Sequence, residues 1–148
     1  MKPPDTLFLS ARTLPASPDA VYAAFEQPAL LAAWWGPDGF SNHFESFDFR
    51  VGGRWVFVMQ GPDGTRYPNT SVFEALEPGR RVVLRHDCPP YFTLTVSLQP
   101  APGGTQLTWE QVFDDAATAR AVRAIVGPAN EQNLDRLTHV LTAHLPHG

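Results

Sequence analysis

The sequence predicts an α+β fold in which a curved antiparallel sheet of about six to seven strands wraps around a long C-terminal helix. Three observations favour this fold. The chain has 148 residues, a length typical of one domain, so we expect a single domain over residues 1–148. Short segments separated by turn residues alternate apolar and polar side chains, as strands do. The last segment repeats leucine at helical spacing.

The N-terminal part of the chain predicts one strand and two short helices. Leu7 to Leu14 alternates at the period of a strand. Ser17 is a suitable N-cap and Pro18 suits the first position of a helix, because its missing amide hydrogen would be unpaired there. Gln27-Pro28 ends this helix and begins the second, which runs to Trp34 before a Gly-Pro-Asp-Gly turn.

The middle of the chain predicts six further strands. Glycine and proline occur between these strands at regular intervals. These residues favour turns, and proline also lacks the amide hydrogen that the hydrogen-bond ladder of a sheet requires. The shortest connections give a meander in one antiparallel sheet. The expected strands are His43 to Val51, Arg54 to Gln60, Tyr67 to Leu76, Arg81 to Asp87, Tyr91 to Leu98 and Gln106 to Phe113.

The C-terminal part predicts two helices. Asp114-Asp115 caps the first, which we expect to end at Val126 because proline at position 128 cannot complete the helical ladder. The second is expected from about Ala129 to Leu145. Its apolar stripe needs an apolar partner, and the sheet is the candidate that the chain offers.

Composition argues against several classes of protein. The formal net charge of −4 and the lack of a basic cluster argue against a nucleic-acid partner. Cys88 is the only cysteine, which excludes an internal disulfide and a cysteine-based zinc site. The Met-Lys-Pro-Pro-Asp start lacks the apolar core of a signal peptide, and no stretch approaches 18 uninterrupted apolar residues. We therefore expect a cytoplasmic protein without membrane insertion.

Four local patterns together resemble one known family, called Aha-like after an activator of a heat-shock-chaperone ATPase, within the START-like or SRPBCC superfamily. The resemblance covers nearly the whole chain and implies the helix-grip fold of that superfamily. It also implies binding of hydrophobic molecules between sheet and helix, as in the wider superfamily, or a co-chaperone role, as in the family name. The patterns are Trp34-Trp35-Gly36-Pro37, Asp48-Phe49-Arg50-Val51-Gly52-Gly53-Arg54-Trp55, Glu77-Pro78-Gly79-Arg80-Arg81-Val82 and Leu134-Asp135-Arg136-Leu137.

This chain departs from the resemblance at the start of the last helix. Many relatives look to have Gly-Trp there, whereas this chain has a polar segment from Pro128 to Asn133. Because this segment is polar rather than aromatic, it weakens any inference that this chain binds the same ligand as a relative.

The aromatic residues, 10 Phe with 4 Trp and 3 Tyr, bring large apolar areas that suit a core or a binding pocket. Strand alternation places several of them on the concave face of the sheet, where we expect a ligand pocket beneath the last helix. Packing in the core is the alternative role for each of these side chains. The predicted walls are Trp34, Trp35, Phe47, Trp55, Phe57, Met59 and Trp109, with His86, Gln111 and Asn130 as polar groups that orient the ligand.

A catalytic alternative pairs His86 with Glu74 or Glu110 as proton carriers, because histidine titrates near neutral pH and a neighbouring carboxylate tunes its pKa. The alternation around Glu74 leaves open which face of its strand it occupies.

A metal site is not expected among the C-terminal histidines. His139 and His144 lie five positions apart and so point to different sides of a helix, and proline precedes His147. We predict neither a metal nor a cofactor.

The leading hypothesis is a binding domain that encloses a small hydrophobic or aromatic molecule and has no assigned reaction. The alternative is a co-chaperone-like module that binds a chaperone or another protein through its surface. The third is a cyclase-, aromatase- or hydrolase-like enzyme built on His86. An exposed edge strand would also permit a homodimer.

Overall fold

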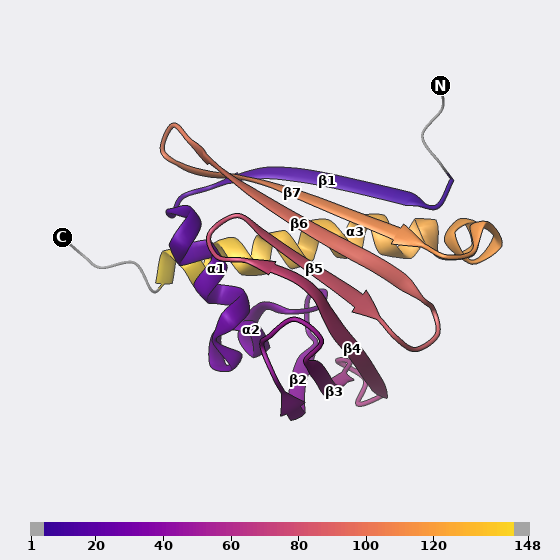
Figure 1. Ribbon diagram of the computed structural model, residues 1–148. Helices are drawn as coiled ribbons and strands as arrows, with labels where there is room; N and C mark the ends of the chain where they lie inside the picture. The colour runs from indigo at the N-terminus through magenta and orange to yellow at the C-terminus, as the bar shows by residue number, and fades with distance from the viewer. Residues whose placement is uncertain (1–4, 144–148) are drawn as a thin grey trace.

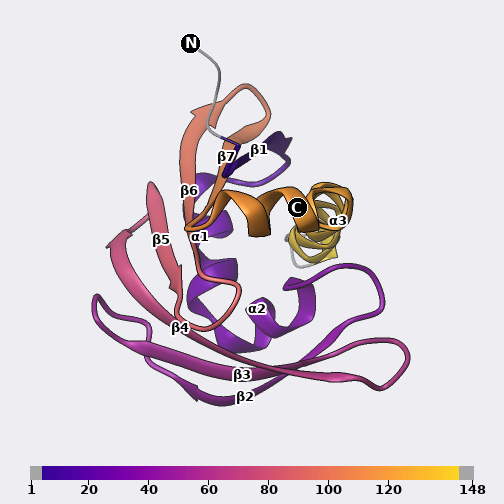
Figure 2. The same ribbon diagram turned by 90° about the vertical axis from the view of Figure 1, so that its right-hand side faces the viewer.

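The computed structural model describes residues 5–143 and confirms the predicted fold class. Seven antiparallel strands form one sheet in the order β1-β7-β6-β5-β4-β3-β2. Figures 1 and 2 show this sheet curving around the three helices. The strands are β1 (Leu7–Leu14), β2 (Ser41–Phe47), β3 (Arg54–Gln60), β4 (Arg66–Glu77), β5 (Arg81–His86), β6 (Phe92–Ala101) and β7 (Gly104–Phe113), and the helices are α1 (Pro18–Glu26), α2 (Pro28–Trp34) and α3 (Ala116–Ala143).

Two β-bulges bend the sheet. The pairing of β2 with β3 shifts register between Phe44 and Ser46, and the pairing of β4 with β5 shifts between Phe73 and Ala75. An extra residue on one strand increases the local twist and bends that strand. The second bulge settles the orientation of Glu74, which lies at the shift and is exposed.

Strand β2 is shorter than predicted, because it ends at Phe47 rather than at Val51. A turn follows, in which the Arg50 amide donates to the Asp48 carbonyl. A Cβ at Gly53 would lie 2.0 Å from the Asp48 carbonyl oxygen, so only glycine fits this turn. Val51 lies in this turn and is 64% exposed.

The prediction of two C-terminal helices is wrong, because α3 is one helix that contains Pro128. The missing amide hydrogen costs one helical bond, and a proline ring bends a helix without always ending it. Figure 2 shows the bend, with the orange first part of α3 crossing the view and the yellow second part seen along its axis. The predicted end at Leu145, together with His144 and His147, lies outside the described residues.

Helix α3 is held across the concave face by packing and by charge. It packs against α1, α2, β1 and β7. Arg12 of β1 lies 2.6 Å from the Asp135 carboxylate and 3.0 Å from that of Glu131, both on α3. The two acidic residues stand one turn apart on the same side of the helix, so one arginine of β1 reaches both. Within residues 5–143, no helix combines the length and apolarity that a membrane span requires.

Candidate functional site

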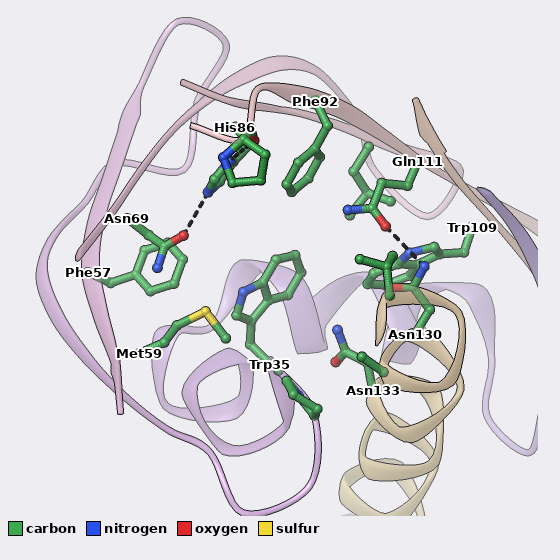
Figure 3. A pocket seen from close by; sticks show the side chains of 16 residues that line it. Trp35, Phe57, Met59, Asn69, His86, Phe92, Trp109, Gln111, Asn130 and Asn133 are labelled. Carbon is green, nitrogen blue, oxygen red and sulfur yellow. Dashed lines mark hydrogen bonds between the residues drawn. The ribbon is translucent and has the colours of Figure 1, made fainter. Parts of the chain in front are cut away.

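A pocket of about 240 Å³ lies between the sheet and the middle of α3 (Figure 3). Five strands, from β3 to β7, supply its floor, α3 supplies the opposite wall, and the segment after α2 closes one side. Apolar and aromatic side chains dominate the lining. The lining residues are Trp35, Gly36, Pro37, Phe57, Met59, Asn69, His86, Pro90, Phe92, Leu94, Trp109, Gln111, Val126, Ala129, Asn130 and Asn133.

Most of the residues predicted for a pocket do line this one, and three do not. Trp34, Phe47 and Trp55 are absent from the lining. Those that line it are Trp35, Phe57, Met59, His86, Trp109, Gln111 and Asn130.

The three remaining residues are part of the core. Trp34 has no exposed surface, and its indole N–H donates to the Ala24 carbonyl at 2.9 Å, which joins α2 to α1. Trp55 is 1% exposed and stacks on Phe57 with ring centroids 4.0 Å apart. Phe47 packs edge-on against Trp55 and is partly buried against the core. The structure thus places Trp34 and Trp55 in the core and Phe47 against it, away from this pocket.

Other lining residues were not predicted, although the sequence carried a signal for two of them. Asn69 has the same strand parity as Ser71 and Phe73, and Phe92 has that of Leu94. Val126 and Ala129 had no such signal, because a helix break was expected between them.

Arg136 of α3 holds the wall that follows α2. One guanidinium nitrogen donates to the carbonyls of Trp35, Gly36 and Pro37 at 3.2, 2.9 and 2.9 Å. The other donates to the carbonyls of Ala33 and Phe40 at 3.1 and 3.0 Å. Burial lowers the pKa of Arg136. The ordinary pKa of a guanidinium group is so far above neutral pH that Arg136 stays charged despite this burial.

We call the contact of Arg136 with these five carbonyls the Arg136 clamp. It brings together two sequence patterns that are about a hundred residues apart. The Trp-Trp-Gly-Pro segment supplies the carbonyls and the Leu-Asp-Arg-Leu segment supplies the guanidinium. The planar group presents its donors in a fixed fork, which suits a loop whose carbonyls converge. One side of the pocket is thereby fixed to α3.

His86 forms another part of the wall, and both of its ring nitrogens face oxygen atoms. Nδ1 lies 2.8 Å from the Pro90 carbonyl and Nε2 lies 2.7 Å from Oδ1 of Asn69. The Asn69 amide nitrogen donates to the Tyr67 carbonyl, which keeps its oxygen turned toward His86. Burial is the main cause that lowers the pKa of His86. The neutral ring, which stacks on Phe92, can donate to one oxygen at a time.

The structure does not bring either carboxylate of the catalytic alternative into the pocket with His86. Glu74 and Glu110 are exposed, and neither lines the pocket. None of the lining residues is Asp, Glu, Lys or Arg. Within residues 5–143 no three His, Cys, Asp or Glu side chains gather closely enough to hold a metal ion.

Three buried carboxamides line the side of the pocket formed by β7 and α3. The amide nitrogen of Asn130 donates to the Gln111 carbonyl oxygen at 3.0 Å. Asn133 lies one turn further along α3, and its carbonyl oxygen has no hydrogen-bond partner among the described residues. The same is true of the indole nitrogen of Trp109 beside them. Hydrogen-bonding capacity therefore remains free at this side.

Comparison with known proteins agrees with this architecture. Residues 15–142 match the model of the family described as Activator of Hsp90 ATPase homolog 1-like protein. No curated protein matches the chain.

Solved structures show the same fold. A protein from Arthrobacter aurescens is 24% identical with a TM-score of 0.87, over 97% of this chain and 91% of that one. One from Rhodobacter sphaeroides is 26% identical with a TM-score of 0.84, over 98% and 99% of the two chains. An AHSA1-like protein from Aeromonas hydrophila is 22% identical with a TM-score of 0.77, over 96% and 99%.

Replacing Arg136 by lysine tests the clamp. Arg136→Lys keeps the charge but cannot serve five separate carbonyls, so we expect the free energy of unfolding in urea to fall by about 2 kcal/mol. Arg120→Lys is the matched control on the same helix, where an exposed arginine lies 3.8 Å from Asp5; it should change stability by less than about 0.5 kcal/mol. Equal effects of the two substitutions would contradict the clamp.

The lowered pKa of His86 predicts how stability depends on pH. The ordinary value is 6.5, so just below it the unfolded chain binds the proton more readily than the folded one. The free energy of unfolding should therefore fall as the pH drops from about 7 to about 5. His86→Gln should flatten this part of the curve, while His43→Gln, at an exposed position, should preserve it. A pH curve unchanged by His86→Gln would refute the assignment.

Proposed function

The chain belongs to the family of Activator of Hsp90 ATPase homolog 1-like proteins, as its four sequence patterns predict, and on this premise we propose that it binds a small hydrophobic or aromatic molecule between the sheet and α3. The observation that carries the proposal is the apolar pocket itself. The pocket has a volume of about 240 Å³ and a mainly apolar and aromatic lining with a few polar groups, as small-molecule sites typically have.

The size of the pocket limits the occupant. An apolar cavity of about 150 Å³ is enough for benzene, whereas drug-sized ligands occupy roughly 300–1,000 Å³. The pocket lies between these limits. It therefore suits one aromatic ring with a small substituent better than a sterol or a long acyl chain.

The polar groups of the pocket favour binding over catalysis. General acid–base chemistry needs a titratable group free to reach the substrate. His86 is the titratable residue among those that line the pocket, and both of its nitrogens already face protein oxygens. Binding without a reaction is the function that this arrangement supports best.

The proposed location is the cytoplasm, where a reducing environment suits the unpaired Cys88. We also propose that the chain acts as one domain, because one sheet and its helices share the principal core of the described residues.

A substitution that fills the pocket tests the binding proposal. Ala129→Phe places a ring against the lining, and we expect it to abolish binding of toluene, measured by ligand-observed NMR, while the protein stays folded. Ala124→Phe, at an exposed position of the same helix, should bind toluene as the parent does. Toluene binding that survives Ala129→Phe would place the ligand elsewhere, and no binding to the parent would refute the proposal.

A second candidate function is a protein-binding role like that in the family's name. The observation that favours it is an apolar patch on the outer face of β1 and β7, where Leu9 is 62% and Val112 is 40% exposed. Leu7 pairs directly with Val112 and extends the same patch. Contiguous exposed apolar side chains mark interaction surfaces, and β1 is an edge strand that a partner or a second copy could extend.

The protein-binding candidate predicts an effect on a chaperone. The purified chain should accelerate ATP hydrolysis by a purified Hsp90, and Leu9→Lys should remove the acceleration by placing a charge in the patch. Gln99→Lys introduces the same charge at an exposed position of β6 and should leave the acceleration intact. An ATPase rate that the parent chain does not change would refute this candidate.

A further inference from the structure

The polar groups of the pocket divide into a set that faces oxygen atoms of the protein and a set that has few protein partners. His86 and Asn69 are paired with each other, and their remaining groups face the carbonyls of Pro90 and Tyr67. The carboxamides of Gln111, Asn130 and Asn133 share one hydrogen bond among them. Each carboxamide can donate two hydrogen bonds and accept two, so most of the capacity of this group is unused by the described residues.

Part of the unused capacity lies where a ligand would bind. Gln111, Asn130 and Asn133 all line the pocket and are each more than nine-tenths buried, and the carbonyl oxygen of Asn133 is itself enclosed by protein. Figure 3 shows Gln111 reaching in from the sheet and Asn133 from the helix, with Phe57 and Met59 on the far side. The pocket thus has a polar side and an apolar side.

Charge is missing from this polar side. No acidic or basic side chain lines the pocket apart from His86, whose pKa is lowered by burial. Arg136 lies behind the wall formed by Trp35 to Pro37, and its donors are taken by backbone carbonyls. A ligand carboxylate or ammonium would lose its hydration without gaining an opposite charge, which is costly.

We infer that the ligand of this pocket is an uncharged one-ring aromatic molecule whose neutral polar group, a carboxamide or hydroxyl, pairs with Gln111, Asn130 and Asn133. This inference rests on the proposed binding function and narrows it to a chemical class. The ring lies against Trp35, Phe57 and Phe92. A side-chain carboxamide offers both donors and acceptors, so it matches a ligand group that also does both.

Benzamide and benzoate test the inference, because they have nearly the same shape and differ in charge. Titration calorimetry near neutral pH should show benzamide binding at least about tenfold more tightly than benzoate. Toluene serves as the probe without a polar group. Benzoate binding as tightly as benzamide would overturn the inference, while toluene binding in the same experiment would keep the proposed function.

Asn133→Leu tests the role of the carboxamides, since leucine has a similar volume and no polar group. It should weaken benzamide about tenfold and leave toluene within about twofold of the parent, because only benzamide loses hydrogen bonds. Gln111→Met is the second variant, with the same expectation, should Asn133→Leu fail to fold. Gln99→Leu, at an exposed position, should change neither affinity.

The outcomes separate the two proposals. Equal weakening of benzamide and toluene by the folded variants would overturn the pairing with the carboxamides and leave the binding function in place. Failure of benzamide, benzoate and toluene alike to bind the parent would overturn both.

Discussion

The attachment of one loop to one helix determines the shape of the candidate site. The Arg136 guanidinium donates to five backbone carbonyls between residues 33 and 40, so the segment after α2 cannot move independently of α3. That segment carries Trp35, whose ring is a wall of the pocket and packs against both Trp55 and Trp109. Arginine is suited to this task because it carries five donors in one plane and stays charged when half buried.

The pocket exists because sheet and helix diverge at one end. Two bulges bend the sheet and Pro128 bends α3, and the pocket lies between the sheet and the part of α3 that contains Val126, Ala129 and Asn130. Trp34, Trp55 and Phe47 fill the closely packed end. At the other end the chain has Ala129, Asn130 and Asn133, whose small side chains leave space that larger apolar ones would fill.

The polar residues of the pocket serve two physical purposes. Asn69 and His86 contact each other and connect β4, β5 and the turn that follows β5. The carboxamides near α3 are only partly hydrogen-bonded. A buried amide group without a hydrogen bond destabilises the folded protein, and a ligand that forms this hydrogen bond would remove the penalty. Under the proposed binding function, a ligand that pairs with these carboxamides would stabilise the folded protein.

The sequence by itself determined the strands, the inward face of most of them and the family, because a strand period of two and the turn residues act locally and leave a direct pattern. Tertiary structure alone decided which inward residues line the pocket. Trp55 and Phe57 have the same parity on β3, yet Phe57 borders the pocket while Trp55 is covered by Trp35, Phe44 and Phe47, which come from other parts of the chain. It also decided that Pro128 bends α3 instead of ending it, since packing against the sheet compensates for a single lost helical bond.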